Sequence, residues 1–172
     1  MGIVRESVSG ACNLDYPNYE VIVVDNGSTD GSGEQIREYL DSKCKIKNKY
    51  IKLSRNLGFN AANNIAFRAR DKDSKYIALL NNDAAPYPDS LGRLVERLES
   101  DEKLAAIQGI ITNWNASSID NVGFMVDELL YSHAIYRGYP PHAVKKSHYC
   151  TYVSGAYRLY SIKSREAVNK GE

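Results

Sequence analysis

The chain has 172 residues, of which 43% are hydrophobic and 25% are charged, and its formal net charge is +1. These values suit one compact domain, which we predict to span residues 1–172. They argue against a disordered chain and against binding of nucleic acid through a general positive field. No apolar run approaches the ~18 residues of a membrane-spanning helix.

Three strand–loop–helix units follow a first helix predicted over residues 1–14. Each unit begins with a short apolar or β-branched strand, namely Tyr19–Val24, Tyr50–Leu53 and Tyr76–Leu80. Polar loops rich in Asn, Asp and Gly follow these strands and are typical of turns. Helices are predicted behind the loops, one ending at about Asp41 and the others spanning Ala61–Ala69 and Leu91–Leu98.

The remainder of the chain is predicted with less regularity. Strands are expected at Ile107–Thr112 and Tyr149–Val153, and a last helix near Ser164–Asn169. The Asn-rich segment from Trp114 to Gly123 is expected to be a loop, in which the indole ring packs against the protein or offers a platform for a sugar.

The cysteines give no sign of a structural role. Cys12, Cys44 and Cys150 are odd in number, far apart and without a Cys-x-x-Cys pair. We therefore expect neither a disulfide framework nor a zinc site, and a reducing, cytoplasmic compartment. His142 and His148 could join Cys150 as zinc ligands, but their spacing matches no common pattern.

The predicted strands end at regular intervals. From Val24 to Leu53 is 29 residues and from Leu53 to Leu80 is 27, the length of a β-loop-α-loop repeat with parallel strands. The polar loops after the three strands should then gather at one sheet edge, where open α/β sheets bind ligands. Amides, an arginine and a carboxylate at that edge suit a nucleotide with a divalent cation. Neither the Gly-x-Gly-x-x-Gly fingerprint of dinucleotide-binding proteins nor a P-loop is present.

Four motifs, in this order, resemble family 2 glycosyltransferases, particularly the rhamnosyltransferase-like branch. They are YPNYEVIVVDNGSTDGS at 16–32, RNLGFNAANN at 55–64, LLNND at 79–83 and VSGA at 153–156. The resemblance implies a GT-A fold, which is a mostly parallel α/β sheet flanked by helices. It also implies a UDP- or dTDP-linked sugar as donor, Mg²⁺ or Mn²⁺, and inverting transfer to a glycan or lipid-linked acceptor at the cytoplasmic side, where the protein could be peripheral to the membrane.

The same resemblance implies roles for single residues. It places the nucleotide on Asp25, Asn26, Ser28, Arg55, Asn56, Gly58, Asn81 and Asn82, the metal on Asp83, and the acceptor side at Ser154 and Gly155. Asn81 stands where the family has the first carboxylate of its metal motif. Asp83 is therefore left to bind the cation together with the diphosphate.

The general base is not identified by these motifs. Asp120, Asp127, Glu128 and Glu166 are available carboxylates, and none matches the family's acidic motif. The family's first strand has no counterpart either, so we expect a chain truncated at both ends that binds a nucleotide sugar weakly without transferring it. The alternative to a transferase is a nucleotide-binding module with no catalysis of its own.

The missing first strand has a consequence for the sheet. In the resembled fold it lies between the strands predicted at Tyr19–Val24 and Tyr76–Leu80, and its absence would leave two rows of unpaired backbone groups. We expect these strands either to pair directly or to receive a segment from a neighbouring chain in a homodimer.

Overall fold

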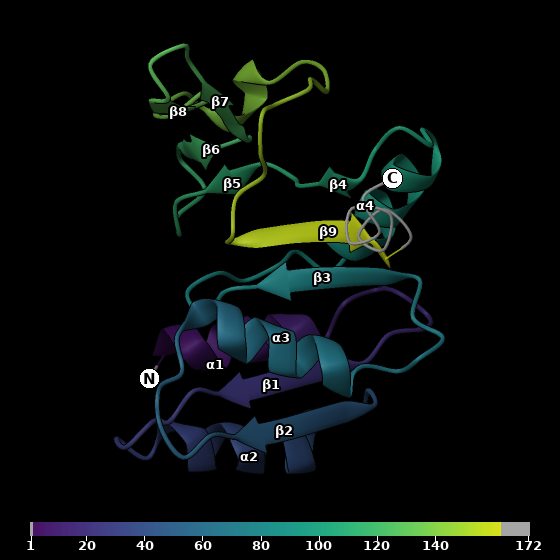
Figure 1. Cartoon of the computed structure of the whole chain (residues 1–172), viewed down its shortest axis with the longest axis vertical. Coiled ribbons are helices and arrows are strands. Elements are labelled where there is room, and N and C mark those ends of the chain that lie inside the picture. Colours follow the sequence, from purple (N-terminus) through teal and green to yellow (C-terminus); the bar gives the residue numbers. More distant parts are fainter. Residues whose placement is uncertain (1, 163–172) are drawn as a thin grey trace. The chain divides into compact units, whose positions relative to one another are not determined.

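The computed structural model describes residues 2–162, drawn in Figure 1 with their helices and strands labelled. They form two compact units, which are described separately. The first holds residues 2–77 and 82–92, and the second holds residues 78–81 and 93–162. The helix predicted near Ser164–Asn169 lies outside the described residues.

The first unit is built on a pair of parallel strands. β1 (Val21–Asp25) pairs with β2 (Asn48–Lys52) in a register that runs from Val21 opposite Asn48 to Asp25 opposite Lys52. α2 (Ser32–Lys43) connects the two strands, as the spacing of the sequence predicted. Both strands lie within two residues of their predicted bounds, and their parallel direction is confirmed.

The core of this unit lies between the strand pair and two helices. Buried side chains come from α1 (Gly2–Cys12), from β1 and from α2, and they are Val8, Cys12, Val21, Ile36 and Leu40. α3 (Phe59–Ala69) contacts β1 but contributes no residue to this cluster. Because neighbouring side chains of a strand point to opposite faces, β1 has apolar partners on both.

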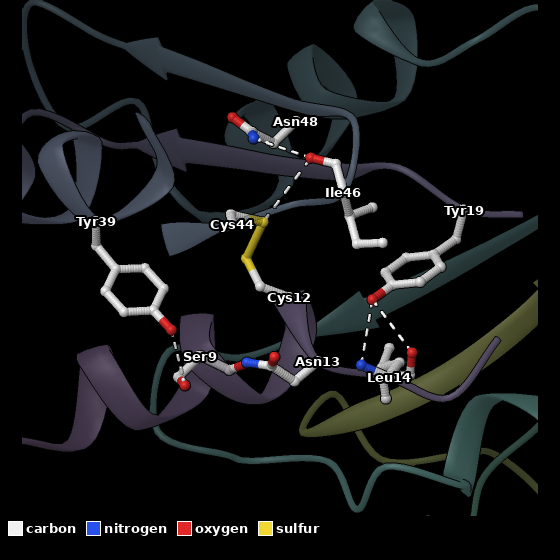
Figure 2. The surroundings of a disulfide bond; sticks show 9 residues. All are labelled: Ser9, Cys12, Asn13, Leu14, Tyr19, Tyr39, Cys44, Ile46 and Asn48. Carbon is white, nitrogen blue, oxygen red and sulfur yellow. Dashed lines mark hydrogen bonds between the residues drawn. A yellow bond between two sulfur atoms is a disulfide. The ribbon is translucent and has the colours of Figure 1, made fainter. Parts of the chain in front are cut away.

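A disulfide joins the C-terminal ends of α1 and α2. Figure 2 shows Cys12 bonded to Cys44, with a Cα–Cα distance of 5.4 Å. Beside it, Tyr39 donates its hydroxyl to Ser9 at 2.9 Å. Our expectation of no disulfide was wrong because the cysteines are 32 residues apart in sequence and only the packing of two helices makes them neighbours. The disulfide also removes the reason for expecting a reducing compartment.

β3 has the predicted bounds, Tyr76–Leu80, but belongs to another sheet. This sheet has the order β3-β9-β4, with β9 at Tyr157–Ser161 and β4 at Ala106–Ile107, and β4 and β9 are antiparallel. Among the described strands, β1 and β3 thus belong to different sheets, so the first alternative, direct pairing of these two strands, is wrong. The second alternative, a segment donated by a neighbouring chain, stays a prediction. α4 (Ser90–Glu99) follows as predicted.

Short antiparallel pairs make up the rest of the second unit. β5 (Ile111–Thr112) pairs with β6 (Ile119–Asn121), and β7 (Phe124–Val126) with β8 (Ser132–Ala134), before the 3₁₀ turn η1 (Pro141–Ala143). The strand predicted over Ile107–Thr112 is thus divided between β4 and β5. The prediction of a strand at Tyr149–Val153 is wrong, because only Tyr152 forms an isolated bridge there.

Within residues 2–162, no helix has the length and apolar character needed to cross a membrane.

Candidate functional site

The loops that follow β1 and β2 are joined by a hydrogen-bonded clasp. Asn26 donates its amide Nδ2 to Oδ1 of Asn56 at 2.9 Å, and its Oδ1 accepts the backbone N–H of Leu57 at 2.9 Å. Asn56 Oδ1 also accepts the backbone N–H of Gly58 at 2.8 Å. The prediction that polar residues after parallel strands meet is confirmed for these two loops.

Gly27 allows the two loops to approach so closely. Its φ is 86°, a left-handed value that favours glycine. A Cβ at this position would lie 2.5 Å from the carbonyl carbon of Arg55 and 2.7 Å from the nitrogen of Asn56. The clasp therefore needs a glycine here, for both its backbone conformation and its lack of a side chain.

Asp25 is 7% exposed, and its side chain is bonded to residues outside the clasp. Its Oδ1 accepts the backbone N–H of Ser28 and its Oδ2 accepts the hydroxyl of Tyr50, both at 2.8 Å. Gly33, at the start of α2, lies against this pair. The carboxylate thus anchors the loop that carries Asn26, and a contact from Asp25 to a nucleotide stays a prediction.

The surroundings of Asp25 determine its ionisation. Burial alone raises the pKa of the carboxyl, but hydrogen bonds from Ser28 and Tyr50, together with the charge of Lys52, outweigh it and bring the pKa below its usual value. Burial and then the hydrogen bond to Asp25 raise the pKa of Tyr50 to about 12. The pair is therefore a carboxylate and a neutral phenol at neutral pH.

The other residues predicted to bind the nucleotide lie partly in the second unit. Ser28 and Arg55 are exposed next to the clasp. Asn81 belongs to the second unit, where its backbone N–H donates to the carbonyl of Ala156 at 3.0 Å. Asn82 and Asp83 are exposed in the turn that follows.

The predicted acceptor-side loop is held by a network of amide side chains. The backbone N–H of Ser154 donates to Oε1 of Gln108, whose Nε2 donates to Oδ1 of Asn121 at 2.9 Å. Asn121 is 1% exposed and also accepts the backbone N–H of Gly123 at 3.3 Å. The loop closes on itself through a bond of 3.2 Å from the N–H of Ala156 to Oγ of Ser154.

Sequence reasoning missed Gly27, Gly33, Tyr50, Gln108 and Asn121. The glycines stood in a loop and at a helix start, where glycine is common for other reasons. Tyr50 was counted as strand packing. Gln108 and Asn121 act as a pair separated by 13 residues, and neither carries a local signal.

The residues available for a metal ion give a limited fit. Within residues 2–162, no group of three or more His, Cys, Asp or Glu side chains could hold a metal ion, and this includes the zinc alternative at His142, His148 and Cys150. Asp83 is a single exposed carboxylate, a hard oxygen ligand of the kind that Mg²⁺ and Mn²⁺ prefer. It suits such an ion only where substrate phosphates supply the other ligands.

The fold and the clasp together indicate the class of the protein. The chain has an α/β fold in which the loops after the parallel strands β1 and β2 form a hydrogen-bonded polar surface. The chain belongs to glycosyl transferase family 2, whose family model matches residues 2–164. The GT-A-like α/β fold is thereby confirmed.

Curated relatives are similar to parts of the chain. An uncharacterised glycosyltransferase of Haemophilus influenzae is 34% identical over 107 residues, which are 60% of this chain and 31% of that protein. An undecaprenyl-phosphate 4-deoxy-4-formamido-L-arabinose transferase of Aeromonas hydrophila is 36% identical over 104 residues, or 59% and 28% of the two chains. The chain thus spans about three tenths of the length of these relatives.

A solved structure extends the likeness of the fold to nearly the whole chain. The mannosyltransferase PcManGT from Pyrobaculum calidifontis, in complex with GDP-Man and Mn²⁺, superposes with a TM-score of 0.65 at 18% identity. The match covers 98% of this chain and 42% of the mannosyltransferase.

Proposed function

We propose that this chain binds a nucleotide-diphosphate sugar as part of an inverting transferase that moves a hexose or deoxyhexose to a glycan or lipid-linked acceptor. Family membership supports the reaction class. The mannosyltransferase with GDP-Man and Mn²⁺ supports the donor class, and the name of the Aeromonas relative supports a lipid-linked acceptor. Rhamnose is our hypothesis for the sugar.

The clasp between the loops after β1 and β2 is the observation that carries this proposal. Asn26 and Asn56 are hydrogen-bonded to each other, so the surface costs little ordering free energy when a nucleotide binds. Amide groups suit a base or ribose, and the exposed guanidinium of Arg55 suits a phosphate.

Asp83 is the residue that we expect to hold the divalent cation. When bound with the donor, the cation would supply positive charge beside the leaving diphosphate. The protein's own contribution is the exposed carboxylate in the turn after β3.

We expect binding without transfer when this chain acts alone. Two of the available carboxylates already have partners: Asp120 accepts a hydrogen bond from Asn121 at 2.8 Å, and Asp127 pairs with His133 at 2.8 Å. A positioned base contributes a factor of ~10²–10⁴ in rate. A nucleotide-binding module therefore remains the alternative to a self-sufficient enzyme.

The test is calorimetric titration with UDP-, dTDP- and GDP-sugars in the presence of Mn²⁺. We expect a Kd on the order of 1 mM for the preferred donor, equivalent to about 4 kcal/mol. Asp83→Ala should abolish the part of this affinity that depends on Mn²⁺ and leave Tm unchanged, because the side chain is exposed.

Asp89→Ala is the matched control, since Asp89 directly precedes α4. As a helix cap it should cost about 1 kcal/mol of stability and no affinity. Equal Mn²⁺-dependent affinity in Asp83→Ala and the unmodified chain would remove the metal assignment, and no binding of any nucleotide would overturn the proposed function.

A further inference from the structure

The tip of the β7–β8 hairpin presents large apolar side chains to solvent. Leu129 is 77% exposed, Leu130 84% and Tyr131 65%. Exposed single leucines are common, but three consecutive large apolar side chains at a hairpin tip are not explained by packing within the unit.

The tip is ordered by its own hydrogen bonds. Oδ1 of Asp127 accepts the backbone N–H groups of Leu129 and Tyr131, both at 2.9 Å. The backbone N–H of Asp127 donates to the carbonyl of Tyr131 at 3.0 Å, and that of Leu130 to the carbonyl of Asp127 at 3.0 Å. These bonds hold Leu130 at a φ of 64°, a left-handed conformation that is unfavourable for leucine. The exposure of its side chain is therefore built into a defined turn.

The chain that follows the tip is cationic. From Leu129 to Ile162 the sequence has no Asp or Glu, carries four Lys or Arg residues, and includes all three histidines of the protein. The Lys and Arg residues are Arg137, Lys145, Lys146 and Arg158. Arg137 lies 3.7 Å from a carboxylate oxygen of Asp120, and the Nε of Arg158 is buried, so the exposed Lys145 and Lys146 carry the charge that faces solvent. Asp127 and Glu128 precede this stretch, and Asp127 is paired with His133. A stretch of this composition attracts an anionic surface.

Ring contacts and hydrogen bonds keep part of this stretch beside the hairpin. Tyr152 stacks on Phe124 of β7 with the ring centroids 4.9 Å apart, and its hydroxyl is hydrogen-bonded to Ser132 of β8. The ring of His148 lies 6.1 Å from that of Tyr136, which follows β8. Lys145 and Lys146 are therefore no more than three residues along the sequence from His148, whose ring contacts the segment that follows β8.

We propose that the β7–β8 tip and the cationic segment 132–148 form a site that binds the surface of an anionic membrane. Leu129 and Leu130 enter the boundary between headgroups and acyl chains, Tyr131 lies at the interface, and the lysines contact anionic headgroups. An anionic bilayer accounts for both the apolar tip and the cationic segment, because its apolar layer lies directly below a negatively charged one. This site consists only of residues of the second unit, and its assignment does not rest on the proposed nucleotide surface.

The test is cosedimentation of the chain with vesicles of phosphatidylcholine alone or mixed with phosphatidylglycerol, without nucleotide. We expect binding only to the mixed vesicles. Replacing Lys145 and Lys146 together by Gln should weaken this binding about twenty-five-fold, at about fivefold for each lysine near an anionic surface. Glu128→Gln removes a negative charge at the tip and should strengthen binding.

Leu130→Asn tests insertion without threatening the fold. Asparagine is better suited than leucine to a left-handed φ, so Tm should not fall, whereas vesicle binding should decrease about tenfold with loss of the apolar side chain. Ile3→Ser is the matched control, since Ile3 is 49% exposed in the first unit, and it should leave vesicle binding unchanged.

Two outcomes would overturn the proposal. Equal binding of Leu130→Asn and the unmodified chain would show that the tip does not enter the membrane. Failure to bind mixed vesicles, combined with concentration-dependent self-association that Leu130→Asn abolishes, would assign the tip to contacts between copies of the chain.

Discussion

Gly33→Ala is expected to destabilise the protein although it replaces a helical glycine. In α2 an alanine should by itself add up to about 1 kcal/mol of stability through helix propensity. A Cβ at Gly33, however, would lie 2.6 Å from Oη of Tyr50 and closer still to Oδ2 of Asp25. These atoms are the two ends of the part-buried hydrogen bond that anchors the loop after β1.

The size of the effect follows from what must move. The carboxylate of Asp25 has to shift, and it then weakens or loses hydrogen bonds to Tyr50 and to the backbone of Ser28. Hydrogen bonds to a charged group contribute about 1.5–3 kcal/mol each. Subtracting the gain in helix propensity leaves an expected loss of about 2–5 kcal/mol in the free energy of unfolding.

Urea-induced unfolding at pH 7 measures this loss, and two further variants show its origin. In an Asp25→Ala background most of the cost of Gly33→Ala should disappear, because the carboxylate is no longer in the way. Gly92→Ala is the control, since Gly92 lies in α4 and a Cβ there would meet no atom closer than 3.9 Å. Stabilisation by Gly33→Ala, or an equal cost with and without Asp25, would refute the reasoning.

Three further predictions concern stability. The pKa of Tyr50 is raised to about 12, so its contribution to the free energy of unfolding is complete below pH 10 and is lost as the pH rises toward 12. Tyr50→Phe should therefore reduce the dependence of stability on pH in this window, and an unchanged slope in pH-dependent unfolding would contradict this. Cys12→Ser removes the disulfide to Cys44, which joins residues 32 apart in sequence, and should lower the free energy of unfolding by about 3–4 kcal/mol. A change below about 1 kcal/mol in chemical denaturation would be inconsistent with a formed bond. Asn121→Ala leaves buried amide partners unsatisfied and should cost about 2–3 kcal/mol in the same assay, while a neutral result would mean that the network around Asn121 does not support its loop.

Local sequence was sufficient for the elements that begin and end with strong signals. β1, β2 and β3 are short apolar runs that polar loops interrupt, and α4 repeats apolar residues at helical spacing. The near-equal spacing of the three predicted strands indicated that they are parallel, and β1 and β2 form such a parallel pair. The meeting of Asn26 with Asn56 follows from that pair. Each of these predictions needed information only from neighbouring residues or from the spacing of the repeated units.

The rest depended on partners that are distant in sequence. Tyr149–Val153 and Tyr157–Ser161 are both rich in tyrosine, and propensity alone favours a strand in either. The second forms β9 because β3 and β4 lie on its two sides, whereas the first has a bridge only at Tyr152. The disulfide was missed for the same reason, because its two cysteines meet only when α1 packs beside α2.

Asp25 and Asn26 show how one sequence motif can hold two separate roles. They are neighbours at the end of β1, yet Asp25 is bonded to Tyr50 in the interior and Asn26 to Asn56 in the loop. Neighbouring side chains at a strand end point in opposite directions, so one can anchor the strand while the other shapes a surface. A ligand at the clasp would therefore contact groups whose positions are fixed by a carboxylate that is itself buried. This is why Asp25 can be essential for binding at the clasp whether or not it touches the ligand.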